Sequence, residues 1–274
     1  MKIALLPNLT RKNALQVSLE VCAELEKHSM SYCIKRDYKD EFKDTKAEFI
    51  TVDEMIKICD IVIAVGGDGT IIHAAKFGKP TLGINAGRIA FMAGLEPSEL
   101  NMLSNLKSGK YELDRRMMLK AEIMSPDNRV LSVHYCVNDA VVARGFQIKM
   151  DDFVVEHNGK FLNKYTADGI IFSTPTGSTA YNLSAGGPIA SPGAQVMLLT
   201  PICAHTLRAR PYVFAAEERL EISSEGQAVI AIDGAEVSRG RNCGVQVYRA
   251  PFRARFIKIS HRRFYQRLNS KLNE

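Results

Sequence analysis

The feature that most constrains the fold is an apolar run, Ile61–Val65, that leads directly into the glycine turn Gly66–Thr70 (GGDGT). Four β-branched residues and one alanine predict a strand that is buried on both faces of a parallel sheet. The residues that follow, Ile71–Phe77, predict a helix that ends at Gly78. Because a strand, a glycine turn and a helix N-terminus let backbone N–H groups face an anion, the stretch predicts a phosphate site.

Length and composition predict a globular protein with one large or two ordinary domains. The chain has 274 residues, of which 46% are hydrophobic and 24% charged. The apolar run at the N-terminus, Ile3–Leu6, is too short for a signal peptide. No stretch approaches the roughly 20 apolar residues that span a bilayer. We therefore expect a cytoplasmic protein without a membrane partner.

Charge and cysteine usage narrow the function classes further. The net charge of +6 suits an anionic ligand, but basic residues are interspersed with acidic ones. Nucleic-acid binding needs a basic stripe with interleaved aromatic residues, and we expect no nucleic-acid partner. The six cysteines are scattered without a C-x-x-C pair, so they predict reduced thiols and no metal site.

The first 110 residues alternate between predicted strands and predicted helices, which indicates a parallel α/β sheet. Apolar periodicity predicts an amphipathic helix over residues 11–27, and the charged segment 37–48 predicts a solvated loop. Strands are expected at 2–6, 31–35, 61–65 and 81–84, and further helices at 53–58, 71–77 and 97–107. We expect an α/β domain over residues 1–114.

After residue 115 the pattern changes to short strands separated by turn signals, such as the Asn158-Gly159 hairpin turn. This pattern predicts a mostly-β domain over 115–250, and the expected architecture is a β-sandwich. The last segment, 251–274, is expected to return to the first domain and to hold a helix at 262–272. The predicted strands are 117–124, 130–137, 153–156, 161–165, 170–173, 196–200, 219–223, 228–232, 245–248 and 254–259.

Three polar stretches are candidates for a functional site. The glycine turn lacks both a Walker A sequence and a G-x-G-x-x-G pattern, and a simple tight turn is the alternative interpretation. The second stretch, Asp168–Tyr181, runs from a strand into a turn dense in hydroxyls that either caps a helix or binds a nucleoside. The third, Asn138-Asp139, follows an apolar strand, and an Asx turn explains it equally well.

Taken together, these stretches resemble the NAD kinases, ATP-dependent enzymes that phosphorylate NAD to NADP. The turn Gly66–Thr70 matches the first motif of that family, and Asn85-x-Gly87 resembles the second. Asn138-Asp139 stands where the family carries Asn and an acid, and Thr174–Tyr181 (TPTGSTAY) matches the most specific motif. Pro201–Pro211 resembles a further segment. The order and spacing agree over nearly the whole chain.

The resemblance implies a Rossmann-like N-terminal domain, a C-terminal β-sandwich, and a homodimer or homotetramer. It implies transfer of the γ-phosphate of ATP to the 2′-hydroxyl of the adenosine ribose of NAD, with Mg²⁺ or Mn²⁺ as divalent cation. Asp68 would be catalytic, and Gly66, Gly67, Gly69 and Thr70 would bind the ATP phosphates. The expected NAD-binding residues are Asp68, Gly69, His73, Phe91, Asn138, Asp139, Lys149, Thr166, Asp168, Thr176, Thr179, Ala180, Tyr181, Asn182, Leu183, Ser184 and Cys203.

The chain departs from the family pattern at two places. The second motif usually continues to Gly-Phe-Leu, where this chain has Ala90-Phe91-Met92, and His73 stands where the family usually carries Arg. Two alternatives to an NAD kinase stay open from the sequence. One is a lipid or sugar-phosphate kinase of the same superfamily, and the other is a non-catalytic nucleotide-binding regulator.

Overall fold

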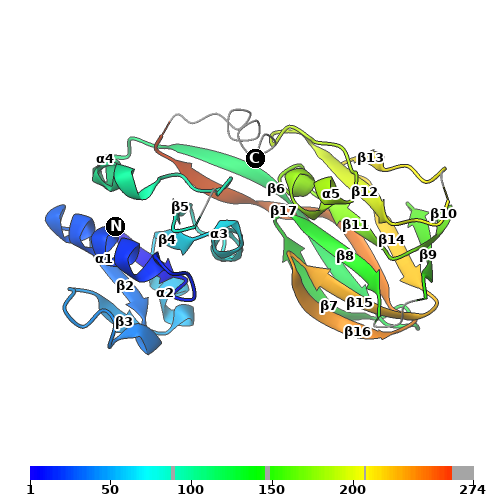
Figure 1. Cartoon of the computed structure of the whole chain (residues 1–274), viewed down its shortest axis with the longest axis horizontal. Helices are drawn as coiled ribbons and strands as arrows, with labels where there is room; N and C mark the ends of the chain where they lie inside the picture. Colours follow the sequence, from blue (N-terminus) through cyan, green and yellow to red (C-terminus); the bar gives the residue numbers. More distant parts are fainter. Residues whose placement is uncertain (88–89, 146–148, 207, 261–274) are drawn as a thin grey trace. The chain divides into compact units, whose positions relative to one another are not determined.

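The computed structural model describes residues 1–87, 90–145, 149–206 and 208–260 (Figure 1). The helix expected at 262–272 lies outside these residues. The chain forms two compact units: the first comprises Met1–Arg115 with residues 254–260, and the second is Arg116–Arg253. Among the described residues, no helix is long and apolar enough to cross a membrane.

The first unit is built on a parallel sheet, as the alternating pattern predicts. The strand order is β17-β5-β4-β1-β2-β3, and each neighbouring pair runs parallel. Helices and 3₁₀ turns connect the strands. The elements are β1 (Lys2–Pro7), α1 (Ala14–Lys27), β2 (Ser31–Lys35), η1 (Arg36–Tyr38), β3 (Glu48–Ile50), α2 (Val52–Ile58), β4 (Ile61–Gly66), α3 (Asp68–Ala75), β5 (Thr81–Asn85), η2 (Pro97–Leu103) and α4 (Ser104–Ser108).

Strand β4 lies between β1 and β5, and all of its residues are buried. This burial confirms the strand that its unbroken apolar run predicts. Helix α3 begins at Asp68, three residues earlier than expected. Gly67 caps it, and the Gly67 carbonyl accepts the N–H groups of Thr70 and Ile71. An acidic residue in the first turn is favourable beside the positive end of the helix, so most of the glycine turn is helical.

The charged segment 37–48 is not entirely a loop. It contains part of η1, and β3 begins at its last residue, Glu48. Phe42, inside this segment, is fully buried and packs in the core of the first unit. One buried aromatic residue among charged neighbours produces no periodic pattern, so the sequence did not predict the burial of Phe42.

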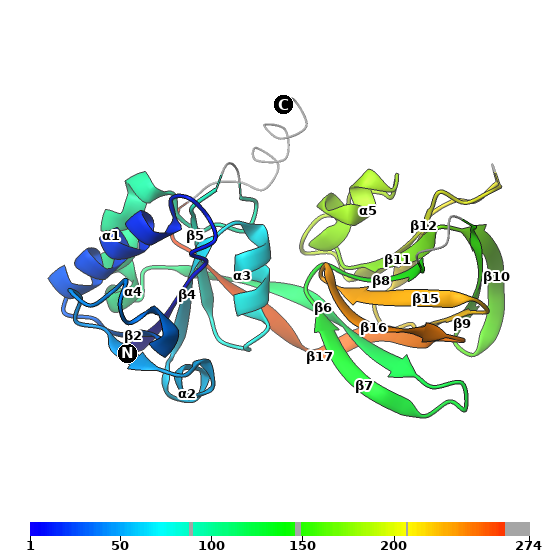
Figure 2. The same cartoon turned by 60° about the horizontal axis from the view of Figure 1, so that its bottom comes forward.

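The second unit contains two groups of antiparallel strands (Figure 2). One sheet has the order β13-β12-β11-β8-β15-β16. The other strands follow the order β10-β9-β14-β17, with β6 paired to β17 and to β7. The strands are β6 (Glu112–Met124), β7 (Val130–Cys136), β8 (Asp139–Arg144), β9 (Asp151–His157), β10 (Lys160–Ala167), β11 (Gly169–Ser173), β12 (Val196–Ile202), β13 (Tyr212–Ala215), β14 (Leu220–Ser224), β15 (Gln227–Ile232), β16 (Ala235–Arg241) and β17 (Gly244–Lys258).

One hydrophobic core joins the two sheets of this unit. It contains residues of both, among them Phe153 from β9 and Phe172 from β11, each fully buried. Apolar packing between two antiparallel sheets is the arrangement of a β-sandwich. The mostly-β character that the turn-separated strands predict is therefore confirmed.

Besides β3, three strands of the second unit were not expected from the sequence: β8, β13 and β16. Asn138-Asp139 was interpreted as the end of a strand, but Asp139 opens β8. The short helices η3 (Gly177–Thr179) and α5 (Tyr181–Ser184) follow β11 directly. Strands expected separately at 245–248 and 254–259 form the single strand β17, although Pro251 lies within it. Proline lacks an N–H donor, so it is unusual inside a paired strand.

Candidate functional site

The glycine turn joins β4 to α3 by very close packing. A Cβ atom on Gly66 would lie 2.4 Å from Oγ1 of Thr70, so only glycine fits there. By contrast, a Cβ on Gly67 or Gly69 would have no protein atom within 4 Å. Packing does not explain the glycines at these two positions. Absent side chains there leave the first turn of α3 open to close approach by a ligand, as phosphate binding requires.

Asp68 is held in one orientation by the loop that follows β5. Its Oδ2 accepts the N–H of Phe91 at 3.1 Å, and its Oδ1 accepts the N–H of Met92 at 2.8 Å. Each carboxylate oxygen can accept more than one hydrogen bond. The carboxylate is half-buried, so it keeps capacity to accept a further proton donor.

These contacts involve the segment 90–92, where the sequence departs from the usual Gly-Phe-Leu of the second motif. Phe91 and Met92 reach Asp68 through their backbone N–H groups. Such bonds do not depend on which side chains the loop carries. The contact with Asp68 is therefore made with the sequence Ala-Phe-Met. His73, the other departure, is exposed on α3, and its ring lies edge-on to Phe77 with centroids 5.3 Å apart.

In the second unit, the hydroxyl-rich stretch after β11 has a largely internal role. Oγ1 of Thr174 donates to the carbonyl of Val137 at 2.6 Å, and Oγ of Ser178 donates to the carbonyl of Pro175 at 2.7 Å. Asn182 is fully buried. Its amide donates to the carbonyls of Ser178 and Pro188 and accepts from Oγ1 of Thr200. In this chain, these side chains therefore shape the turn.

Packing brings the second and third candidate stretches together. The N–H of Thr174 donates to the carbonyl of Asn138 at 2.8 Å. A Cβ on Gly177 would lie 2.2 Å from that same oxygen, so the turn can approach Asn138 only because residue 177 is glycine. Buried Thr176 lies 3.4 Å from a guanidinium nitrogen of Arg116.

Asp233 positions Asn138 and Asp139, and sequence reasoning missed it. It has a left-handed backbone with φ 48°. Its carboxylate accepts the N–H groups of Val137, Asn138 and Asp139 at 3.0, 2.7 and 3.0 Å. The only available signal was an Asp-Gly pair after an apolar strand, which also describes an ordinary hairpin.

Tyr181 lies at the centre of several candidate residues. Its ring is 46% exposed, beside the short helix η3. Partial burial raises the pKa of its hydroxyl, and the negative charges of Cys203, Asp168 and Asp139 raise it further. The structure therefore brings Asp139, Asp168, Tyr181 and Cys203 into one neighbourhood. Thr179, Ala180 and Leu183 are half-buried on the same short helices, and Ser184 is exposed.

Asp168 also has a cationic partner that the sequence did not indicate. Nε of Arg144 donates to Oδ1 of Asp168 at 2.6 Å, and the N–H of Arg144 donates to the carbonyl of Asp168. This pair joins the end of β8 to the residue between β10 and β11. A carboxylate fixed by Arg is a rigid acceptor for ligand hydroxyl or amino groups.

Two other expected residues gather around Asp152 on β9. Oγ1 of Thr166 donates to Oδ1 of Asp152 at 2.6 Å. The pKa of the Asp152 carboxyl is lowered chiefly by the hydrogen bonds from Thr166 and Lys164, with the charge of Lys149 contributing. Lys149 is exposed. The structure therefore places Thr166 and Lys149 beside Asp152.

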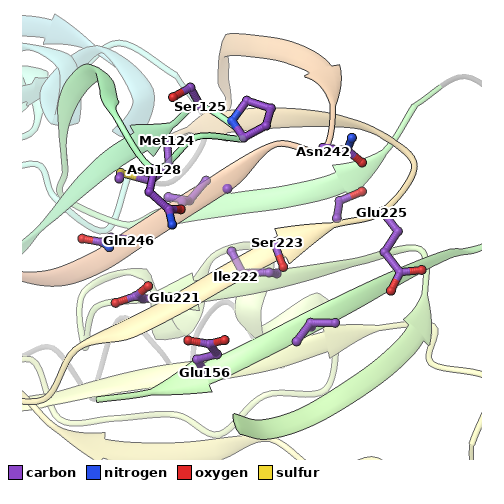
Figure 3. Close-up of a pocket in the computed structure, with 15 residues that line it drawn as sticks. Met124, Ser125, Asn128, Glu156, Glu221, Ile222, Ser223, Glu225, Asn242 and Gln246 are labelled. Atoms are coloured by element: carbon purple, nitrogen blue, oxygen red, sulfur yellow. The ribbon is translucent and has the colours of Figure 1, made fainter. Parts of the chain in front are cut away.

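A separate pocket lies on the strands β9, β14 and β17, with a volume of about 460 Å³ (Figure 3). Glu156 and Glu221 stand directly opposite each other on neighbouring strands, and Glu225 lines the same pocket. Among the described residues that line it there is no Lys or Arg and none of the expected site residues. Glu225 is paired with Lys164 at 3.2 Å, but Glu156 and Glu221 repel a pyrophosphate group, so this pocket does not suit a dinucleotide.

No group of three His, Cys, Asp or Glu side chains that could hold a metal ion occurs among the described residues. The site features are thus a glycine-rich helix start with a fixed carboxylate in the first unit, and a polar cluster around Tyr181 in the second. A strand–turn–helix start of this kind binds anions such as phosphate, and a bound, positioned phosphate is what nucleotide-using phosphotransferases require.

Comparison with known proteins gives the family within this class. The ATP-NAD kinase N-terminal domain matches residues 3–108, and the ATP-NAD kinase C-terminal domain matches residues 137–259. NAD kinase of Carboxydothermus hydrogenoformans is 36% identical over 83% of this chain and 84% of its own length. That of Moorella thermoacetica is 34% identical over all of this chain and 89% of its own length. The chain belongs to the NAD kinase family.

Solved structures agree on the fold. A yeast NADH kinase in complex with NADH superposes with a TM-score of 0.92, covering all of this chain and 87% of that one, at 22% identity. An NAD kinase from Archaeoglobus fulgidus in complex with ATP gives a TM-score of 0.75 over all of this chain and 99% of its own, also at 22% identity. At this identity the likeness shows the shared fold.

Proposed function

We propose that this protein is an NAD kinase that transfers the γ-phosphate of ATP to the 2′-hydroxyl of the adenosine ribose of NAD. The observation that carries the proposal is family membership over nearly the whole chain together with the intact GGDGT turn. No comparison supports a lipid or sugar-phosphate kinase. An intact, oriented Asp68 also argues against a regulator without catalytic activity.

We propose that the first unit handles the phosphate donor. The first turn of α3 lacks intrahelical acceptors for its N–H groups, and these can donate to ATP phosphates. Gly67 and Gly69 leave space for that approach, while Gly66 and Thr70 pack together to shape the turn. Phosphoryl transfer depends mainly on positioning and charge neutralisation, which fixed backbone donors supply.

Asp68 is the proposed catalytic residue. The two backbone N–H groups that it accepts fix the plane of its carboxylate. Proton release from an attacking hydroxyl comes late in a loose transition state, when charge on that oxygen has developed. We propose that Asp68 orients the 2′-hydroxyl and accepts its proton at that stage, without having to be a strong base.

We propose that the second unit binds NAD. Asn138 and Asp139 are fixed by Asp233 and by the turn at Thr174, and they offer an amide and a carboxylate for ribose hydroxyls. The exposed Tyr181 ring offers a stacking face for a base, and Asp168 offers a carboxylate held by Arg144. The proposed set in the second unit is completed by Lys149, Thr166, Thr176, Thr179, Ala180, Leu183, Ser184 and Cys203, with Asn182 shaping the turn. In the first unit, Asp68, Gly69, His73 and Phe91 are also proposed to contact NAD.

We propose Mg²⁺ or Mn²⁺ as the divalent cation. Mg²⁺ is usually held by one or two carboxylates together with substrate phosphates, and it keeps several waters. Asp68 is the carboxylate of the glycine turn, and the described residues hold no larger ligand cluster. The residues present thus fit a cation that is held mainly through ATP and that neutralises phosphate charge when bound.

Assembly and location are also proposals. The family resemblance favours a homodimer or homotetramer. The six cysteines carry free thiols, which supports a cytoplasmic location.

A coupled assay of NADP formation tests the function. Purified protein with ATP, NAD and Mg²⁺ is expected to form NADP, detected by an NADP-specific dehydrogenase. Omitting ATP, or adding EDTA in excess, is expected to stop formation. Absence of NADP with ATP and with either cation would overturn the proposal.

A further inference from the structure

The orientation of Asp68 depends on the loop that leaves the sheet after β5 and returns before η2. The two N–H groups that hold the Asp68 carboxylate belong to Phe91 and Met92 of this loop. The peptide plane sets the direction of a backbone N–H, so these two donors point at Asp68 only while the loop keeps its position. The contacts that hold the loop therefore also determine the orientation of the carboxylate.

Backbone contacts fix the loop where it returns to the sheet. The N–H of Gly94 donates to the carbonyl of Gly83 at 2.8 Å, and the N–H of Asn85 donates to the carbonyl of Leu95 at 3.1 Å. A Cβ atom on Gly94 would lie 2.7 Å from the carbonyl oxygen of Ile257, so the backbone packs too closely here for a side chain. The returning end of the loop is thus part of the packed sheet.

The side chain of Asn85 links the two ends of the loop. It is buried, with 4% of its surface exposed. Its Oδ1 accepts the N–H of Gly87 at 2.9 Å on the outgoing side, and its Nδ2 donates to Oε2 of Glu96 at 2.9 Å on the returning side. Hydrogen bonds of a buried side chain are strengthened by the low local dielectric, so this amide restrains both ends.

Glu96 joins the buried amide to the helix η2. Glu96 is the N-cap of η2: its carboxylate accepts the N–H of Glu99, and the Glu99 carboxylate accepts the N–H of Glu96. The reciprocal bonds of this capping box fix Glu96 at the start of η2. Leu100 and Leu103 of η2 are buried in the core of the first unit. Glu96 therefore connects the loop to an element that apolar packing holds in place.

The outgoing end of the loop also contacts the glycine turn. The N–H of Ala86 donates to the carbonyl of Gly66 at 3.1 Å, two residues before Asp68. The loop thus reaches the turn at its backbone and the Asp68 carboxylate through Phe91 and Met92. A displacement of the loop changes the position of both.

We infer that Glu96 is a positioning residue for Asp68 and that it acts through Asn85 and the loop after β5. The inference rests on the proposed kinase function and adds a residue that controls the catalytic carboxylate from η2. With Glu96 in place, the N–H groups of the loop hold the carboxylate in one orientation toward the 2′-hydroxyl. Without it, the loop and the carboxylate occupy the reactive geometry for a smaller fraction of the time.

Glu96→Ala and Glu96→Gln test the inference by steady-state kinetics. Glu96→Ala removes the acceptor and is expected to lower kcat about tenfold, because small misplacements of a reacting group reduce the rate steeply. The KM values for ATP and NAD are expected to stay within about threefold. Glu96→Gln keeps an oxygen that can accept the amide of Asn85 and the N–H of Glu99, and its kcat should lie within about twofold of the unchanged protein.

Glu99→Ala is the matched control. It removes the other side chain of the same capping box and weakens the start of η2, while the bond between Glu96 and Asn85 stays. Its kcat is expected to lie within about twofold of the unchanged protein. A purely structural role of the capping box would instead affect Glu96→Ala and Glu99→Ala equally.

Hydrogen exchange followed by mass spectrometry reports the state of the loop without turnover. Glu96→Ala is expected to reduce protection in peptides that cover residues 90–95, whereas Glu99→Ala reduces it in η2 alone. A double variant tests the route through Asn85. Adding Glu96→Ala to Asn85→Ala should lower kcat by no more than about twofold further, because the bond between the two side chains is already absent.

The outcomes separate the inference from the function. If the unchanged protein forms no NADP, the proposed function fails, and exchange at residues 90–95 still decides whether Glu96 holds the loop. The inference is overturned if Glu96→Ala lowers kcat less than twofold, if Glu99→Ala lowers it equally, or if Glu96→Gln is as impaired as Glu96→Ala. Unchanged protection at residues 90–95 in Glu96→Ala also overturns it, as does a rise of the KM values as large as the fall in kcat.

Discussion

At the scale of a single residue, the carboxylate of Asp68 is held in one orientation by few contacts. It is the first residue of α3, where a negative charge is favourable beside the helix N-terminus. Two backbone N–H groups from one loop hold its carboxylate. The glycines on either side have no side chain, so the acid is flanked by open backbone. The proposed catalytic role therefore depends on the placement of one carboxylate.

Asp68→Asn is expected to lower kcat by at least about 100-fold, the usual contribution of a positioned acid–base group. Asn keeps one oxygen that can accept an N–H from the 91–92 loop, so NAD affinity should change by no more than a few-fold. Steady-state assays and calorimetry measure the two quantities. Asp53→Asn, an exposed acid in the first turn of α2, is the control. Near-normal kcat in Asp68→Asn would refute the catalytic role.

Cys203 is the exposed thiol of the chain, and the other five cysteines are buried. Burial raises the pKa of Cys22 to about 11 and also raises the pKa of Cys33, Cys59 and Cys243. The thiolate is the reactive form, so these groups react slowly. DTNB is therefore expected to label one thiol rapidly in the folded protein.

The same labelling tests the NAD-binding assignment. Cys203→Ser should remove the fast phase, and saturating NAD should slow it because Cys203 lies beside Tyr181 and Asp168. Cys243→Ser should leave the fast phase unchanged. Equal labelling rates with and without NAD would remove Cys203 from the proposed set.

At the scale of an element, the turn at residues 137–139 depends on partners from far along the chain. Asp233 reaches it from the turn after β15, and Thr174 and Gly177 reach it from the turn after β11. Backbone N–H groups bonded to a carboxylate are oriented more strongly than those bonded to neutral acceptors. Asn138 and Asp139 are thus presented by a rigid turn.

Asp233→Ala is expected to raise the KM for NAD about tenfold or more and to lower the free energy of unfolding of the second unit by about 3 kcal/mol. It removes an acceptor of three N–H groups, and hydrogen bonds to charged groups contribute about 1.5–3 kcal/mol each. Asp233→Asn keeps an oxygen and tolerates positive φ, so its effects should be smaller. Urea denaturation and KM measurements for both substrates check this.

The KM for ATP should not change in Asp233→Ala. Asp127→Ala, which alters a carboxylate bonded to Ser125 in another turn of the second unit, is the control. A normal KM for NAD in folded Asp233→Ala would show that the turn does not position NAD.

The local sequence was sufficient to predict the elements with strong apolar periodicity, but it was insufficient to predict the roles of the turn residues. The apolar run of β4 and the pattern of α1 are local signals, and both elements were correctly predicted. The roles of Asp233 and Arg144 depend on pairing between strands far apart in the sequence. Asp139 is the first residue of strand β8. A polar pair after an apolar run can end one strand or begin the next, and the sequence does not distinguish the two.

The same reasoning applies to the candidate site. Motif positions indicated which stretches matter but not which side chains remain available. Asn182 and Ser178 lie inside the most specific motif, yet their polar atoms are bonded within the protein. Whether a hydroxyl stabilises a turn or binds a ligand depends on the burial of that side chain. The burial of a single side chain in a turn cannot be predicted from the sequence.

At the scale of the whole molecule, the two units have separate hydrophobic cores. One core contains Phe42, Ile63 and Leu82 of the first unit, with Ile257 and Ile259 from the end of the described chain. The other contains residues of the second unit alone, such as Phe153 and Phe172. Each core draws on residues that are far apart in the sequence of its own unit. Chains built this way commonly unfold in more than one step.

Phe42→Ala and Phe153→Ala are expected to destabilise different units. Each deletes a fully buried ring from one core, and such deletions cost about 3–5 kcal/mol. Hydrogen exchange followed by mass spectrometry resolves the response by segment, which suits a chain without tryptophan. Phe42→Ala should lose protection mainly in β1, β4 and β5, and Phe153→Ala mainly in β9, β11 and β14. Leu15→Ala, at an exposed position of α1, should leave both patterns unchanged.

Bound ligands are expected to increase the protection from hydrogen exchange that the Phe variants decrease, in the unit that binds each ligand. Because the donor is proposed to bind the first unit and NAD mainly the second, AMP-PNP should raise protection around α3, and NAD around β8 and β11. A bound ligand stabilises the folded form by mass action, so the effect grows with ligand concentration. Equal loss of protection in both units for either Phe variant would show that the molecule unfolds as one cooperative body. In that case the separate responses to the two ligands would also be absent.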